Sequence, residues 1–344
     1  MKYDLRIFII LKRLWPLNKV HSTAPDKSTC EMEPILLVHG GAGNIPNERV
    51  PGKLTGCKKS VQIGYKILKN GGSALDAVEA AVRYMEDDEN FNAGYGSVLN
   101  LDGEVEMDAS IMIGSNLNAG AVTVVRDIKN PISLARLVME KTPHVLLAGA
   151  GANKFASENG ISTVEPGSLV TKAAQQALEN FKRKGGSLTE IGHKNPGDVG
   201  TVGAVALDVN GNLAAATSTG GINGKMVGRS SDTCMIGSGT YADDEVAAIS
   251  TTGHGETIAK FCLANSIIRE MMHGQSAQDA TEDVLKKMTA RLNNTAGAIT
   301  LDNKGEVGIF FTSEKMSWAY RKEDLLHFGI FPNQHETEDA IEDN

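Results

Sequence analysis

Threonines stand beside glycines at the ends of three predicted strands. Thr201 follows Gly200 and opens a β-forming run, Thr219 closes the next run, and Thr252 closes a third, just before residues 253–255, Gly-His-Gly. Threonine is common in strands, so a single such residue carries little weight. Together they indicate a pocket, because hydroxyls at adjacent strand ends can converge and glycine leaves backbone N–H groups open to a ligand.

A charged pair follows in the loop after the second of these strands. Arg229 and Asp232 lie three residues apart in the segment GRSSD. A guanidinium fork binds a carboxylate with two hydrogen bonds, and an aspartate can bind an ammonium group. The pair therefore predicts a site for a ligand that carries both groups, and a surface salt bridge is the alternative interpretation.

Other common catalytic motifs do not occur in the sequence. The stretch TGGINGKM is similar to a phosphate-binding loop, but Thr219 stands where that motif needs glycine, and Met226 stands where it needs Ser or Thr. GxSxG, HExxH and GxGxxG are absent, and the 8 histidines show no ligand spacing for a metal. We therefore exclude nucleotide hydrolysis and a zinc enzyme.

The composition is typical of a globular protein. Of 344 residues, 41% are hydrophobic and 22% are charged. No apolar run reaches the roughly 18 residues of a membrane helix. The net charge is −8 and the body of the chain has no basic stripe, so we expect neither a membrane nor a nucleic-acid partner. The 4 cysteines form no CxxC pair, which favours a reducing compartment.

The chain divides into four parts by composition. Residues 1–33 are basic and poor in acidic residues, which is typical of either a poorly ordered extension or a mitochondrial presequence. Residues 34–200 alternate between strand-like and helix-like segments and end in a polar linker over 183–199. Residues 201–332 begin abruptly with TVGAVALD, and residues 333–344 form an acidic tail that we expect to be frayed.

Strand and helix signals predict a mixed α/β architecture. Two β-type runs around Asn210-Gly211 predict a hairpin, and AITLDNKGEVGIFFT predicts a second. Strands such as 204–207 are apolar at nearly every position, so we expect both of their faces to be covered. A sheet, or two stacked sheets, should then lie between helices. Helices are predicted at 54–69, from Ser73, at 133–141, at 169–182, and as a pair within 255–290 broken near Gly274.

These motifs resemble the plant-type (type III) asparaginases, also called isoaspartyl peptidases, which are N-terminal-nucleophile hydrolases. The resemblance covers residues 35–332 in family order and implies a four-layer αββα sandwich. The matching segments are HGGAG (39–43), FNAGYGSVLN (91–100), EVEMDASIM (104–112), GTVGAVALD (200–208), ATSTGG (216–221), MVGRSSD (226–232), GTYADD (239–244), STTGHGE (250–256) and LHFGI (326–330).

The resemblance implies that the precursor cuts itself between Gly200 and Thr201. The α subunit would be 34–200 and the β subunit 201–332, forming one catalytic domain jointly. Cleavage would leave Thr201 with a free α-amino group, whose pKa near 7.7–8.0 suits a general base for its own hydroxyl.

The resemblance also implies roles for the remaining site residues. Thr201 would be the nucleophile, Thr219 and Thr252 would orient it, and Asn92 would lie near it. Thr252 and Gly253 would stabilise the oxyanion. The substrate would be bound within two segments: Arg229, Ser230, Ser231 and Asp232, and Thr252, Gly253, His254 and Gly255. Arg229 would take its α-carboxylate, Asp232 and the Gly255 carbonyl its α-amino group, and the His254 side chain would be structural.

The implied function is hydrolysis of L-asparagine to L-aspartate and ammonia, and of β-aspartyl dipeptides. No cofactor is required, although the family often holds a structural sodium on backbone carbonyls of the loop at residues 85–94. The α and β chains would stay associated, as a dimer of αβ units. We expect a cytoplasmic protein, or a mitochondrial one if residues 1–33 are a presequence. The alternative is an uncleaved, non-catalytic homologue acting as a binding or scaffold protein, which would stay a single band on a denaturing gel.

Overall fold

The structure is a computed structural model and describes residues 32–184 and 200–340. The predicted extension up to residue 31, the linker over 185–199 and the last four residues of the tail lie outside this part. Arg183, the first residue of the predicted linker, belongs to a helix. Met32 already belongs to the fold, because its N–H donates to the Val209 carbonyl.

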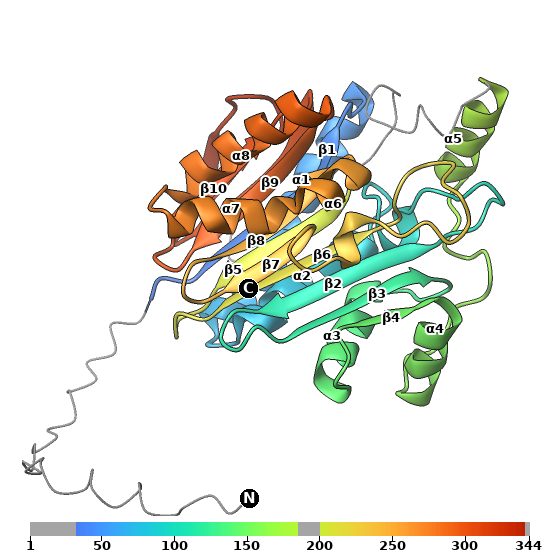
Figure 1. The fold of residues 1–344 in the computed structure, drawn as a ribbon, viewed down its shortest axis with the longest axis horizontal. Helices are drawn as coiled ribbons and strands as arrows, with labels where there is room; N and C mark the ends of the chain where they lie inside the picture. The colour runs from blue at the N-terminus through green and yellow to red at the C-terminus, as the bar shows by residue number, and fades with distance from the viewer. Residues whose placement is uncertain (1–31, 185–199, 341–344) are drawn as a thin grey trace, which may run out of the picture. The chain divides into compact units, whose positions relative to one another are not determined.

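Two sheets lie face to face between layers of helices in the described part of the chain (Figure 1). The larger sheet has nine strands there, and the smaller has four. In spatial order the larger consists of β13 (Glu336–Asp339), β12 (Leu325–Gly329), β11 (Lys315–Lys322), β1 (Ile35–Gly43), β5 (Val202–Leu207), β6 (Leu213–Thr219), β2 (Met107–Ile113), β3 (Ala119–Val125) and β4 (Leu146–Ala148). The smaller consists of β10 (Val307–Phe311), β9 (Ala296–Asp302), β8 (Ala247–Gly253) and β7 (Thr240–Asp243).

Helices cover the outer face of each sheet. On the larger sheet, α1 and α2 contact β1, and α3 contacts β2 and β3; on the smaller, α7 and α8 contact β8 and β9 respectively. This arrangement confirms the predicted αββα sandwich. The helices are α1 (Val50–Lys69), α2 (Ala74–Glu86), α3 (Pro131–Lys141), α4 (Gly149–Glu158), α5 (Lys172–Arg183), α6 (Gly255–Phe261), α7 (Leu263–Met272) and α8 (Ala277–Leu292), with short 3-10 turns η1 (Asn47–Arg49), η2 (Gly94–Gly96) and η4 (Asp232–Cys234).

The central strands are apolar throughout because both of their faces are buried. In β1, Leu36 and Val38 pack with the helix layer, whereas Ile35 and Leu37 pack between the two sheets. The predicted hairpin around Gly211 is confirmed: β5 and β6 pair antiparallel, and Gly211 takes a φ of +81°, which favours glycine.

The strand order interleaves the two predicted subunits. β5 and β6, which follow residue 200, lie between β1 and β2, which precede it. β5 pairs with β1 over five residues, and β6 pairs with β2 over six. The start of β5 and the end of β6 therefore lie side by side, at one end of two central strands.

Two predictions for the C-terminal part are wrong. The predicted helix pair has three members, because Cys262 takes a left-handed conformation (φ +51°) that ends α6 and begins α7, besides the predicted break near Gly274. The acidic tail is not frayed at Glu336–Asp339, because β13 pairs with β12. No helix in residues 32–184 or 200–340 is long and apolar enough to cross a membrane.

Candidate active site

Thr201 and Thr219 lie side by side where β5 begins and β6 ends. Val202 pairs with Ser218, so Thr201 falls opposite Thr219. The Thr201 hydroxyl donates to the Thr219 hydroxyl oxygen at 3.1 Å. Both residues are buried, at 6% and 1% exposure. The structure thus brings together two of the three predicted strand ends.

Thr252 reaches the same place from β8 of the smaller sheet. Its hydroxyl oxygen accepts a hydrogen bond from the Ala42 N–H at 3.1 Å. That oxygen is also 2.7 Å from the point where a Cβ on Gly200 would lie. Because Thr252 already accepts one hydrogen bond, its own proton remains free to donate to a negatively charged oxygen.

The segment HGGAG presses against the bond between residues 200 and 201. Gly41 takes a φ of +107°, and a Cβ there would stand 2.5 Å from the Gly200 carbonyl oxygen. A Cβ on Gly200 would in turn stand 2.7 Å from the Ala42 nitrogen. Only glycine fits at both positions, so the Gly200 carbonyl is held in a tight backbone cradle.

Asn92 anchors the glycine turn that follows β6. Its side-chain amide donates to the Gly221 carbonyl at 2.8 Å and accepts from the Val98 N–H at 3.0 Å. The Gly221 N–H donates to the Thr219 hydroxyl at 3.0 Å. Asn92 therefore acts on Thr219 through the backbone, at one remove from Thr201.

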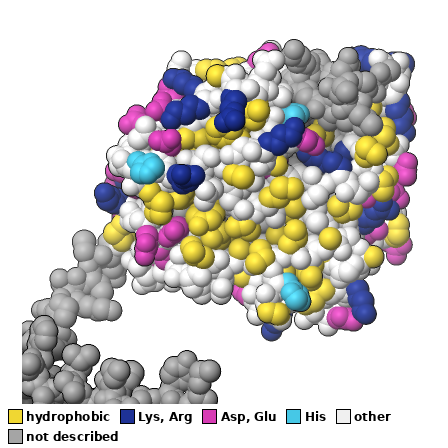
Figure 2. Space-filling model, viewed as in Figure 1, with side chains coloured by type: hydrophobic (Ala, Val, Ile, Leu, Met, Phe, Trp, Pro, Cys, Tyr) yellow, Lys and Arg dark blue, Asp and Glu magenta, His cyan; other side chains and the backbone are white. Residues whose placement is uncertain are grey.

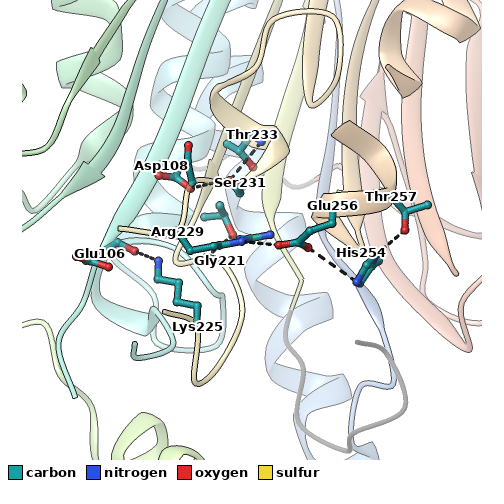
Figure 3. Close-up of polar contacts among 12 residues, drawn as sticks. Glu106, Asp108, Gly221, Lys225, Arg229, Ser231, Thr233, His254, Glu256 and Thr257 are labelled. Carbon is teal, nitrogen blue, oxygen red and sulfur yellow. Dashed lines mark hydrogen bonds and ion pairs between the residues drawn. The ribbon is translucent and has the colours of Figure 1, made fainter. Parts of the chain in front are cut away.

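Arg229 and Asp232 face the same space next to Gly255. A Cβ on Gly255 would stand 2.7 Å from both Arg229 Nη2 and Asp232 Oδ1. Arg229 Nε donates to Glu256 Oε1 at 2.8 Å, as Figure 3 shows. Its buried Nη1 has no hydrogen-bond partner within the described residues. Nε of the guanidinium is thus held by Glu256, and Nη2 lies beside Gly255 and Asp232, where a ligand carboxylate would approach it.

Burial sets the ionisation of Asp232. The side chain is 3% exposed, and this desolvation raises the pKa of Asp232 to about 7, opposed by the nearby charge of Arg229. A buried carboxylate that needs a cation fits an ammonium ligand, whose charge would favour its ionised form.

Three residues predicted to contact the substrate form side-chain hydrogen bonds within the protein. The Ser230 hydroxyl lies 2.6 Å from that of Thr123, and the Ser231 hydroxyl accepts from the Thr233 N–H at 3.2 Å. His254 Nδ1 lies 2.5 Å from the Thr257 hydroxyl, which agrees with a structural side chain. These contacts shape the loop and the start of α6 around the Arg229 and Asp232 site.

Sequence reasoning assigned no role to three charged residues at the site. Glu256 orients Arg229, and Asp108 on β2 holds the loop by accepting from the Ser231 N–H at 2.8 Å. Lys225 lies fully buried beside the glycine turn. Asp108 is the one acidic residue within β2, MDASIMI, which was a visible signal, whereas Lys225 was set aside with the phosphate-loop pattern.

An αββα sandwich with a threonine at the start of an interior strand defines the class of N-terminal-nucleophile hydrolases. The family model described as Asparaginase matches residues 32–330. Similar curated relatives are each named isoaspartyl peptidase/L-asparaginase. The Bos taurus protein is 50% identical over 300 residues, covering 87% of this chain and 96% of the relative. The Homo sapiens protein is 48% identical over 303 residues, covering 88% and 97%, and the Xenopus laevis protein is 48% identical over 306, covering 88% and 97%. The chain therefore belongs to the asparaginase family.

Proposed function

We propose that this protein hydrolyses L-asparagine to L-aspartate and ammonia, and cleaves β-aspartyl dipeptides, after cutting its own chain before Thr201. The observation that supports this most strongly is the pair of hydroxyls at Thr201 and Thr219, placed against the carbonyl cradle of Gly200. The names of the relatives support the same two substrates.

Self-cleavage would begin with the Thr201 hydroxyl oxygen attacking the Gly200 carbonyl carbon. The C–N bond between the two residues breaks, the nitrogen takes a proton, and an ester forms between Gly200 and the threonine oxygen. Water then hydrolyses the ester, which leaves a carboxylate on Gly200 and a free α-amino group on Thr201. Thr252 supports this step, because its hydroxyl lies beside Gly200 and could donate to the oxyanion that forms there.

Turnover would use the new amine as the general base. It takes the proton of the Thr201 hydroxyl, whose oxygen attacks the side-chain amide carbon of the substrate. The oxyanion would be stabilised by Thr252 and the Gly253 N–H, and such a donor is typically worth about 3–4 kcal/mol. Ammonia or an amino acid leaves with the proton, and water releases aspartate from the ester.

The same two charged groups would bind both substrates. Arg229 offers Nη2 to the α-carboxylate, and Asp232 takes the α-amino group together with the Gly255 carbonyl. Asparagine and β-aspartyl dipeptides both carry these groups beside a side-chain amide. The leaving group therefore points away from the Arg229 and Asp232 site in each case.

The two chains would remain together after the cut. β5 and β6 from the C-terminal chain lie between β1 and β2 from the N-terminal chain, so separation would break two strand pairings in the sheet interior. We further infer a dimer of αβ units. Figure 2 shows hydrophobic side chains gathered across the middle of one face, a surface typical of a protein contact. Size-exclusion chromatography tests the dimer.

The loop at residues 85–94 has the chemistry of a sodium site. A Cβ on Gly94 would stand 2.1 Å from the Glu86 carbonyl oxygen, and one on Gly96 would stand 2.0 Å from that of Phe91 and 3.0 Å from that of Glu89. Glycine therefore keeps side-chain atoms away from three backbone oxygens, of which that of Glu89 accepts from Arg49 Nη2 at 3.5 Å, and oxygens are the ligands of hard cations. We propose that these carbonyls hold sodium and so rigidify the loop that carries Asn92.

A denaturing gel tests the proposed function. Wild-type protein should resolve into chains of 200 and 144 residues out of 344, and the cleaved material should release ammonia from asparagine. Thr201→Ala should stay intact and inactive. A Thr201→Ala chain that still splits at this bond would refute the mechanism, and a wild-type chain that stays whole and inactive would favour a scaffold protein.

A further inference from the structure

Lys225 is a buried lysine that the reaction above does not use. It comes from the motif TGGINGKM, and its side chain is 1% exposed. Nζ donates to the backbone oxygen of Glu106 at 2.6 Å and to that of Gly220 at 2.9 Å, the former shown in Figure 3. The Glu106 carboxylate turns instead to Arg126, at 2.7 Å. Burying an ammonium on carbonyl oxygens alone costs free energy, so packing does not account for it.

The ammonium of Lys225 connects to the proposed nucleophile through one peptide group. The Gly220 carbonyl and the Gly221 N–H belong to the same peptide unit. Lys225 binds its oxygen at 2.9 Å, and its N–H donates to the Thr219 hydroxyl at 3.0 Å. That hydroxyl also accepts from Thr201 at 3.1 Å. A cation at one end of such a chain fixes and polarises every hydrogen bond along it.

We propose that Lys225 is a positioning residue for the Thr201 nucleophile, acting through the Gly220–Gly221 peptide and the Thr219 hydroxyl. The proposal rests on the function proposed above. The Gly221 N–H occupies one lone pair of the Thr219 oxygen. When Thr201 gives its proton to its own amine, Thr219 can turn its hydroxyl proton toward the Thr201 oxygen. The cation stabilises the negative charge that develops there, and no further reactant is needed.

A competing explanation is that Lys225 serves substrate binding through Arg229. A Cβ on Gly221 would stand 3.1 Å from Lys225 Nζ and 3.0 Å from Arg229 Nη1, so the two cations are close neighbours. Loss of a neighbour of Arg229 would change KM. Loss of a group that acts on Thr201 would change kcat, so the two explanations separate kinetically.

The first test compares Lys225→Met with Lys315→Met in the full-length, self-cleaved enzyme. Lys315 is the matched control, because it is also buried and donates to one backbone oxygen, that of Ile45, at 2.7 Å. Lys225→Met should lower kcat for asparagine by about tenfold or more, the loss expected for one charge-assisted hydrogen bond, with KM within about twofold. Lys315→Met should keep kcat. A raised KM at unchanged kcat in Lys225→Met, or an equal loss of kcat in both variants, would overturn the proposal.

The pH profile of kcat provides a second readout. Burial lowers the pKa of Lys225 to about 8, with Asp108 and Glu106 raising it and Arg229 and Arg126 lowering it further. The ammonium is charged below that pH, whereas the Thr201 amine that acts as the base is neutral only above its pKa near 7.7–8.0. Wild-type kcat should therefore pass through a maximum at about pH 8 and fall above it. In Lys225→Met this decline should vanish, and its persistence would contradict the proposal.

The pH profile of the wild-type enzyme also tests the proposal if Lys225→Met does not fold. Should Lys225→Met fail to fold, the wild-type profile decides alone, and a kcat that does not decline between about pH 8 and about pH 10 overturns the proposal. A failure of the proposed function is distinguishable, because it would show in wild-type protein as the absence of cleavage and of ammonia release before any variant is made.

Discussion

Gly41→Ala tests whether the HGGAG segment positions the bond that breaks. A Cβ at residue 41 would stand 2.5 Å from the Gly200 carbonyl oxygen, whereas ordinary contacts begin at 3.4 Å. The carbonyl or the segment must therefore shift by about 1 Å, and a displacement of that size at a reacting centre can slow a reaction about 100-fold. We expect self-cleavage of Gly41→Ala to slow by about that factor.

Gly71→Ala is the control for backbone strain. Gly71 has a φ of +79°, and a Cβ there would meet nothing within 4 Å. Both variants therefore carry the left-handed penalty of about 1–2 kcal/mol in stability, but only Gly41→Ala disturbs Gly200. Freshly purified precursor is followed on denaturing gels over time, with thermal melting measured alongside. Equal cleavage rates in the two variants would refute the reasoning.

Three further predictions concern Arg229 and Asp232. Arg229→Ala should raise KM for asparagine strongly while self-cleavage continues, because the precursor presents no α-carboxylate at this bond; unchanged asparagine kinetics would remove Arg229 from the site. The pKa of Asp232, raised to about 7 by burial, predicts that kcat/KM falls as the pH drops through about 7, because the carboxylate must be ionised to bind ammonium. Ionising this buried group also destabilises the fold, and the loss is complete above the folded pKa of Asp232. Asp232→Asn should therefore have a higher free energy of unfolding than wild type at about pH 8, by on the order of a few kcal/mol. The difference should vanish below about pH 4, where Asp232 is protonated in both the folded and the unfolded state. Denaturant unfolding at both pH values checks this, and a stability difference independent of pH would contradict it.

Local sequence signals predicted the parts of the site that are close in the chain. Thr201 and Thr219 meet because a tight Asn-Gly turn joins their strands in register. Arg229 and Asp232 are three residues apart in one loop. The nearly continuous apolar composition of the strands likewise predicted a buried sheet between helices.

Local sequence signals could not predict contacts between segments that are distant in the chain. The cradle between Gly41 and Gly200 joins segments far apart in the chain, and the two carbonyls of Lys225 come from a turn and from residue 106. Lys225 also lacked a recognisable pattern, because the phosphate-loop motif around it is incomplete. The strand at Glu336–Asp339 was missed because its exposed acidic residues carry no apolar period, and only pairing with β12 orders them.

The most direct test follows activity and chain cleavage together in one preparation. Intact mass spectrometry and N-terminal sequencing give the fraction of molecules that begin at Thr201, while ammonia release from asparagine is measured on the same samples over time. Hydrolysis should rise in proportion to that fraction and extrapolate to zero for uncut protein. Full activity in protein that remains whole across Gly200 and Thr201 would contradict the central claim that the threonine amine is the catalytic base.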